Sequence, residues 1–134
     1  MARFDSRWRA VMALVAVVED NPDNRLLLQA ILGGSYDVDE YDNGEDALIG
    51  LARRRPDVVL LDISLPGMDG VEILSRIRAD AALRTLRVIA LTAHAMAGDR
   101  EKYLAAGFDE YLTKPIIDET VLMKAIERQV GNGG

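Results

Sequence analysis

The sequence predicts an α/β domain in which helices cover both faces of a five-stranded parallel sheet. Short apolar runs alternate five times with amphipathic segments, which is typical of parallel strands joined by right-handed helical crossovers. Residues Val58–Leu61 are apolar at every position, as expected for a strand buried on both faces. Residues 36–41 form a weaker strand interrupted by acids, which suits a sheet edge. The doubly wound strand order 2-1-3-4-5 is therefore expected.

Turn and cap residues indicate where the elements begin and end. Asn21-Pro22 opens the first helix, because asparagine caps helices and proline suits their first turn. Gly33-Gly34 stops that helix, Asn43-Gly44 turns the chain, and Gly107 supplies a left-handed helix stop. The expected strands are 12–18, 36–41, 58–62, 87–92 and 110–113. The later helices are expected to follow Gly44, to start near Val71, to span 98–106 and to start near Asp118.

Size and composition narrow the classes of protein. A chain of 134 residues with a net charge of −6 suits one domain without general affinity for nucleic acid or acidic membranes. The absence of cysteine excludes disulfides and thiolate sites, and it fits a cytoplasmic location. The apolar run 10–18 is too short to span a bilayer, so no membrane insertion is expected. We expect an extension over 1–11, a domain over 12–130 and a disordered tail over 131–134.

Polar residues stand at the carboxyl ends of four predicted strands. They are Glu19 and Asp20 after the first strand, Asp62 after the third, Thr92 after the fourth and Lys114 after the fifth. Parallel strands end at the same rim of a sheet, so these side chains are expected to converge there. Three carboxylates so close together call for a cation, and their hard oxygens favour Mg²⁺ or a similar ion such as Mn²⁺.

A metal ion alone needs neither a threonine nor a lysine, whereas a phosphoryl group uses both. Phosphoryl transfer depends on positioning and on neutralising charge at the phosphoryl oxygens. Lys114 and Thr92 can each contact one such oxygen while the metal ion takes a third. Asp62 is central and suits the nucleophile, which would become an acyl phosphate. Glu19 and Asp20 then remain for the metal.

Four segments of the chain together resemble the receiver domain of two-component response regulators. These segments are Val18–Asn21, Leu61–Gly70, Ala90–Ala93 and Tyr111–Pro115, and the resemblance extends over residues 12–130. It implies a flavodoxin-like doubly wound fold. It also implies that Asp62 is the phosphoacceptor and that Asp20 binds Mg²⁺ directly. Glu19 would act as an acidic partner through water, although the family often has aspartate at this position.

The resemblance implies several further features. The backbone carbonyl of Ser64 would bind the metal, and the Lys114–Pro115 peptide bond would be cis. On phosphorylation the Thr92 hydroxyl would move toward the phosphoryl group and Tyr111 would turn inward. The helix 98–106, the last strand and the last helix would then present an altered face to a downstream protein.

The phosphoryl donor is expected to be a histidine kinase or a histidine phosphotransfer protein. The helix that starts at Asn21-Pro22 and the loop after Pro115 flank the site, so they form the expected docking surface for the donor. Ser64 and His94 each lie two residues beyond a strand-end site residue, and we expect them to tune the hydrolysis of phosphorylated Asp62. No DNA-binding output domain and no turnover of external substrates is expected.

Three other functions compete with this interpretation. A flavin-binding flavodoxin-like protein would need a loop rich in glycine, serine and threonine where this chain has Glu19-Asp20. A hydrolase of the haloacid-dehalogenase type would need a second acid at the position of Ser64. A pseudo-receiver that only binds protein would not require the intact set Asp20, Asp62, Thr92 and Lys114.

Overall fold

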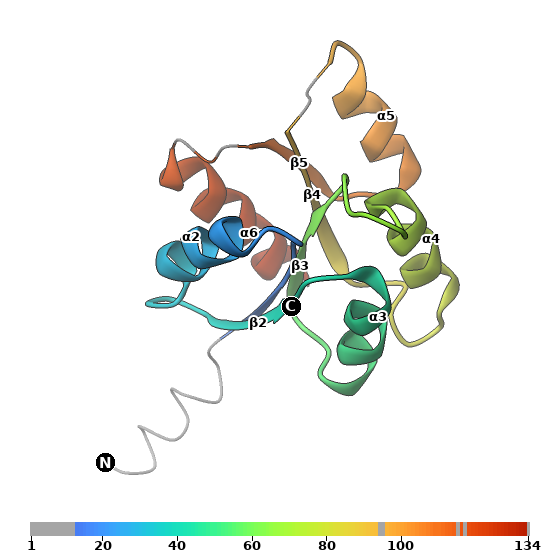
Figure 1. Ribbon diagram of the computed structural model, residues 1–134, viewed down its shortest axis with the longest axis horizontal. Coiled ribbons are helices and arrows are strands. Elements are labelled where there is room, and N and C mark those ends of the chain that lie inside the picture. Colours follow the sequence, from blue (N-terminus) through green and yellow to red (C-terminus); the bar gives the residue numbers. More distant parts are fainter. Residues whose placement is uncertain (1–12, 94–95, 115, 117, 134) are drawn as a thin grey trace.

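Strands and helices alternate along the whole described chain. The computed structural model describes residues 13–93, 96–114, 116 and 118–133. With the labels of Figure 1, the elements in chain order are β1 (Leu14–Val18), α2 (Pro22–Leu32), β2 (Asp37–Tyr41), α3 (Gly44–Arg53), β3 (Val58–Asp62), α4 (Gly70–Ala79), β4 (Arg87–Thr92), α5 (Asp99–Ala106), β5 (Glu110–Thr113) and α6 (Glu119–Gly133). Within this part of the chain, no helix is long and apolar enough to cross a membrane.

The five strands form one sheet in the order β2-β1-β3-β4-β5. Every neighbouring pair is parallel, so the predicted topology is confirmed. The register aligns Val18 with Leu61, Asp62 with Leu91, and Thr92 with Thr113. The carboxyl ends of β1, β3, β4 and β5 therefore lie at one rim of the sheet.

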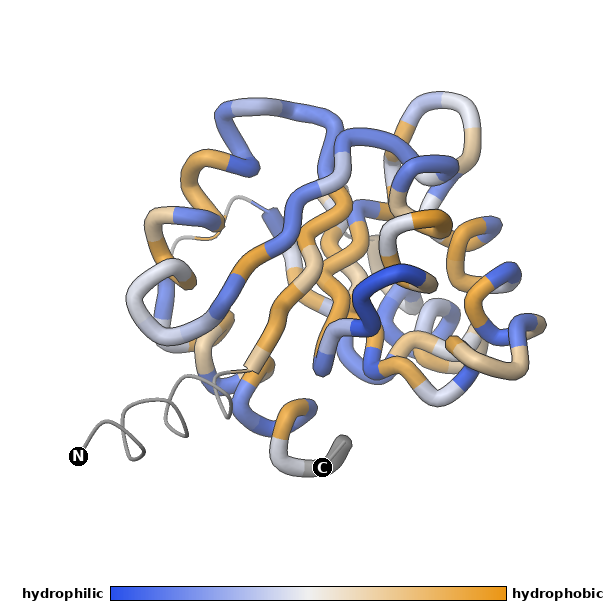
Figure 2. The backbone as a smooth tube through the Cα atoms, turned by 90° about the horizontal axis from the view of Figure 1, so that it is seen from below, coloured by the Kyte–Doolittle hydropathy of each residue, from blue (hydrophilic) through white to orange (hydrophobic). Residues whose placement is uncertain are grey.

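Helices cover both faces of the sheet, with α2 and α6 on one side and α3, α4 and α5 on the other (Figure 1). Alternate residues of β1 serve the two cores: Val15 and Val17 pack with α2 and α6, whereas Ala16 and Val18 pack with α3 and α4. Hydrophobic residues accordingly run through the inner strands, whereas the edge strand β2 is mostly hydrophilic (Figure 2). This two-sided burial explains why the inner strands are apolar at nearly every position.

Side-chain caps set the starts of three helices. Asn21 accepts hydrogen bonds from the backbone N–H groups of Asp23 and Asn24, as predicted for the start of α2. Asn43 caps α3 in the same way, so Asn43-Gly44 starts a helix directly instead of forming a separate turn. Asp69 caps α4 through the N–H of Glu72.

The ends of several elements differ from the prediction by a few residues. Strand β1 begins at Leu14 and β2 at Asp37. Helix α5 ends at Ala106, and Gly107 follows it with φ +117°, which confirms the predicted left-handed stop. Helix α6 continues to Gly133, past the helix end expected before Gly131, because glycine weakens a helix without forbidding one.

At the opposite end of the sheet, the Arg78 side chain of α4 links several segments of the chain. Its guanidinium donates to the backbone carbonyls of Gly107, Leu86 and Arg84 at 2.7, 2.6 and 2.9 Å. It also pairs with Asp109 at 3.1 Å. Arg78 therefore connects α4 with the segments that precede β4 and β5.

Candidate functional site

The side chains predicted to converge do lie together at the carboxyl rim. The Lys114 ammonium is 2.8 Å from Oε1 of Glu19 and 3.1 Å from Oδ2 of Asp62. The Lys114 side chain is 14% exposed, and those of Glu19 and Asp62 are 1% and 3% exposed. The backbone N–H of Lys114 donates to the Thr92 carbonyl at 2.7 Å, which attaches the end of β5 to β4. Residues far apart in the sequence thus form one buried charged group.

Both oxygens of the Asp62 carboxylate have hydrogen-bond partners. Oδ1 accepts a hydrogen bond from the N–H of Ser64 at 2.9 Å, while Oδ2 faces Lys114. The N–H of Ile63 donates to the Leu91 carbonyl, so the chain leaves β3 with its pairing to β4 intact. Both carboxylate oxygens of Asp62 are therefore oriented by groups on neighbouring segments.

The Glu19 carboxylate is held by a residue that the sequence prediction did not include. Its Oε2 accepts from the N–H of Asn21 at 3.1 Å, and its Oε1 accepts from the Asn24 side-chain amide at 3.3 Å as well as from Lys114. Asn24 lies in α2, one helical turn beyond the Glu19-Asp20 pair. That spacing is the signal that would have indicated its role.

Burial and pairing shift the pKa values of Glu19 and Lys114. Burial raises the pKa of Glu19; the hydrogen bonds from Lys114 and Asn21 oppose this rise, and Asp62 adds to it. Burial alone would lower the pKa of Lys114, but its hydrogen bonds to Glu19 and Asp62 outweigh burial and raise the pKa. The two carboxylates are thus held close together by an ammonium that stays charged.

Glu19, Asp20 and Asp62 each offer one oxygen, and these three oxygens lie within 4.8 Å of one another. Asp20 is exposed, whereas the other two are buried, so an ion held here would face both the protein and solvent. Carboxylate oxygens with room for water are the ligands that Mg²⁺ prefers, because this ion loses its water reluctantly. The donor set therefore fits a hard divalent cation.

The other predicted site residues lie at different distances from this group. Thr92 is buried at the end of β4. Ser64 is exposed in the turn after β3. Tyr111 packs at the border of the core, and its ring stacks on that of Tyr103 in α5 with centroids 5.7 Å apart. His94 and Pro115 lie outside the described residues, so the tuning role of His94 and the cis peptide stay predictions.

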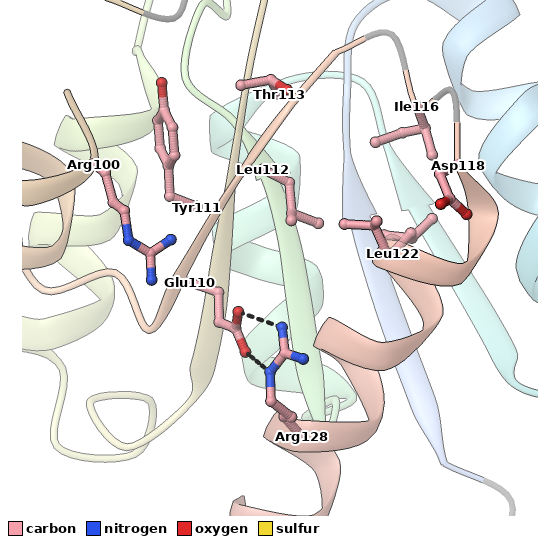
Figure 3. Close-up of a pocket in the computed structure, with 10 residues that line it drawn as sticks. Arg100, Glu110, Tyr111, Leu112, Thr113, Ile116, Asp118, Leu122 and Arg128 are labelled. Atoms are coloured by element: carbon pink, nitrogen blue, oxygen red, sulfur yellow. Dashed lines mark hydrogen bonds and ion pairs between the residues drawn. The ribbon is translucent and has the colours of Figure 1, made fainter. Parts of the chain in front are cut away.

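The Tyr111 hydroxyl is buried and, within the described part of the chain, has no hydrogen-bond partner. Beside Tyr111, a groove of about 490 Å³ runs along β5 and α6 (Figure 3). Leu112 and Leu122 point into it on the α6 side, and Arg128 pairs with Glu110 at its end through two contacts of 2.9 Å. This groove lies on the helix–strand–helix face that was predicted to change.

The start of α4 comes unusually close to the acceptor strand. A Cβ atom on Gly70 would lie 2.6 Å from the Asp62 carbonyl oxygen and 2.7 Å from Cα of Ile63. Both are backbone atoms that cannot rotate away. Only glycine therefore lets α4 start against the end of β3.

Gly70→Ala is expected to lower the free energy of unfolding by about 3 kcal/mol, because the added methyl must displace β3 or α4. Chemical denaturation would measure this loss. Gly34→Ala is the control, since nothing lies within 4 Å of its added Cβ, and we expect a change below about 0.5 kcal/mol. Equal stabilities of the two variants would contradict the close approach.

The chain matches the family model of the response regulator receiver domain over residues 15–127. The polar-differentiation response regulator DivK of Brucella anthropi is 40% identical over 103 residues, which cover 76% of this chain and 84% of DivK. The sensor protein GacS of Pseudomonas syringae pv. syringae is 42% identical over 106 residues, or 76% of this chain. The matched part is only 12% of the length of GacS.

Solved structures give the same result. The receiver domain of the sensor histidine kinase PA1611 from Pseudomonas aeruginosa PAO1 has a TM-score of 0.81 and 37% identity. The match covers 90% of this chain and 99% of that one, whose structure has a magnesium ion coordinated in the active site cleft. The family model, the relatives and the shared fold together lead to one conclusion: this chain belongs to the response regulator receiver domain family of two-component signal transduction.

Proposed function

We propose that this receiver domain accepts a phosphoryl group on Asp62 from a phosphohistidine of a histidine kinase or a phosphotransfer protein in the cytoplasm. The observation that carries the proposal is the buried contact of Lys114 with both Glu19 and Asp62, with Asp20 beside them. A lysine held between two carboxylates provides a fixed positive charge where a phosphoryl group would arrive. No flavin-binding loop or second catalytic acid is needed to explain this arrangement.

In the proposed transfer, a carboxylate oxygen of Asp62 attacks the phosphorus of the donor. The bond from this oxygen to phosphorus forms as the phosphorus–nitrogen bond breaks, and the electron pair of that bond returns to the imidazole. The Lys114 ammonium neutralises charge on one phosphoryl oxygen, and the Thr92 hydroxyl donates to another. The Ser64 N–H on Oδ1 keeps the Asp62 carboxylate oriented during the approach.

The residues that would hold Mg²⁺, or Mn²⁺ in its place, are Asp20, Asp62 and the backbone carbonyl of Ser64, with Glu19 acting through water. When bound, the ion supplies positive charge to a phosphoryl oxygen. The oxygens of Glu19, Asp20 and Asp62 within 4.8 Å support this assignment, as does the magnesium ion in the related PA1611 domain. Ser64 and His94 are proposed to tune the rate at which water hydrolyses phosphorylated Asp62. The domain is not proposed to turn over external substrates.

The donor is proposed to dock on α2, next to Glu19 and Asp20, which form the acidic loop. Leu26 in this helix is 69% exposed, and Leu27 is also exposed. Leu27, Leu91 and Ile116 line a small recess that reaches Lys114. Exposed apolar side chains beside a charged site are typical of a surface that binds another protein.

The signal is proposed to leave through α5, β5 and α6 to a downstream protein. Tyr111 connects the site to this face, because it lies in β5 next to Leu112 and in register with Ala90 of β4. Its buried hydroxyl lacks a partner in the described chain, so a rearrangement that supplies one is favoured. Movement of Thr92 toward the phosphoryl group would provide that rearrangement.

Incubation with acetyl phosphate and Mg²⁺, followed by intact mass spectrometry, tests the proposal. We expect one phosphate adduct per chain, which does not form when EDTA removes the metal before the reaction. Borohydride reduction converts an acyl phosphate to an alcohol, so peptide mapping should locate the modified residue at Asp62. An adduct that forms equally well with EDTA, or maps to another residue, would refute the proposed chemistry.

A further inference from the structure

Arg25, in the first turn of α2, places its guanidinium group at the end of β1. Nη1 donates to the backbone carbonyl oxygens of Glu19 and Asp20 at 2.8 and 3.1 Å. Nε lies 3.5 Å from Oε1 of Glu40 in β2, and the Arg25 side chain is 22% exposed. One side chain therefore joins the first helix, the acidic loop and the edge strand.

The carboxylates of Glu19 and Asp62 are held by hydrogen bonds of their own, whereas that of Asp20 is not. Asp20 is exposed, and among residues 13–93, 96–114, 116 and 118–133 nothing hydrogen-bonds or ion-pairs with its side chain. Its direction therefore follows from its own backbone. Arg25 holds the carbonyl oxygens of both Glu19 and Asp20, while the Glu19 N–H donates to the Tyr41 carbonyl at 3.0 Å.

We propose that Arg25 is a positioning residue for the divalent-cation site. It fixes the backbone of Glu19 and Asp20 so that the Asp20 carboxylate points toward Asp62. Because Arg25 contacts only their backbone carbonyls, the carboxylates of Glu19 and Asp20 stay available to the cation. This inference rests on the cation site of the proposed function. A group that orients metal ligands without touching the metal typically changes metal affinity when it is removed.

Arg25 has two effects on a bound cation, and they have opposite signs. Its positive charge repels the cation, so a variant that loses only this charge would bind the cation more tightly. Its hydrogen bonds orient the ligands, so a variant that loses them binds more weakly. The direction of the change in affinity therefore separates positioning from simple electrostatics.

The test is a titration of the intact protein with Mn²⁺, in which the EPR signal of the free ion gives the dissociation constant. Arg25→Met is expected to weaken Mn²⁺ binding roughly 10-fold. Arg25→Lys keeps the charge and recovers part of the contact, so its constant should fall between those of Arg25→Met and the wild type. Unchanged or tighter binding by Arg25→Met would overturn the inference.

Arg54→Met is the matched control, because Arg54 also pairs with β2, at 2.7 Å from Asp39, and has no hydrogen bond to the acidic loop. We expect its Mn²⁺ affinity to stay within about twofold of the wild type, since its charge is exposed and screened. An equal loss in Arg54→Met would assign the effect to β2 and overturn the role of Arg25.

If Arg25→Met does not fold in a thermal melt, Arg25→Lys decides: a constant weakened at least about threefold supports positioning, and an unchanged one refutes it. A wild-type protein that binds no Mn²⁺ refutes the cation site of the proposed function itself. Failure of the site and failure of the Arg25 role are therefore distinguishable.

Discussion

Asp62→Asn is expected to abolish the phosphate adduct while leaving the fold intact. An amide is not a nucleophile toward phosphorus, so no acyl phosphate can form at this position. The asparagine keeps the size of the side chain and can still accept a hydrogen bond from Lys114 or from the Ser64 N–H. Loss of one negative charge beside Glu19 also relieves repulsion, so we expect the unfolding free energy to change by less than about 1 kcal/mol.

Intact mass spectrometry with acetyl phosphate and Mg²⁺, together with a denaturant titration, would measure both properties. Asp69→Asn is the matched control, because Asp69 lies in the loop between β3 and α4 and caps α4. Asparagine caps a helix about as well as aspartate does. The control should be phosphorylated like the wild type. An adduct that persists in Asp62→Asn would show that a different carboxylate accepts the phosphoryl group.

Lys114→Met is expected to lower the free energy of unfolding by about 3 kcal/mol near neutral pH. The substitution keeps an unbranched chain but leaves the Glu19 and Asp62 carboxylates buried without their ammonium partner. Removal of one partner of a buried ion pair usually costs more than the pair contributes. The phosphate adduct should also form far more slowly, because a charge at the phosphoryl oxygens is lost.

The loss should shrink as the pH falls. Without Lys114, the pKa of Glu19 should rise further above its value in the unfolded chain, because burial already raises this pKa and the opposing hydrogen bond from Lys114 is lost. The folded state then binds more protons than the unfolded state, so stability rises as the pH falls from about 8 to 5. Denaturant titrations across this range would measure the effect. Lys124→Met, at an exposed position of α6, is the control and should be close to neutral. A pH-independent loss would contradict the role of the buried pair.

The sheet and most of the site could be predicted because both follow from local patterns. Apolar runs identify buried strands, and parallel strands necessarily bring their carboxyl ends to one rim. Glu19, Asp62 and Lys114 could therefore be placed together before any coordinates were known. Their spacing in the sequence, by 43 and 52 residues, did not matter once the topology was known.

The supporting contacts could not be predicted in the same way. Asn24 and Arg25 lie in a helical turn, where polar residues usually face water, and only the angle between α2 and β1 turns them toward the acidic loop. The close approach at Gly70 and the stacking of Tyr103 on Tyr111 likewise depend on how helices pack against the sheet. Local sequence carries little information about such packing.

Arg78 and the acidic rim stand at opposite ends of β4, which is six residues long and so about 20 Å in extent. This separation exceeds the distance over which charges are felt in physiological salt, about 8 Å. Changes at the two ends should therefore add independently in their effects on stability. Substitutions near Arg78 could therefore raise the free energy of unfolding without changing the chemistry at the acidic rim.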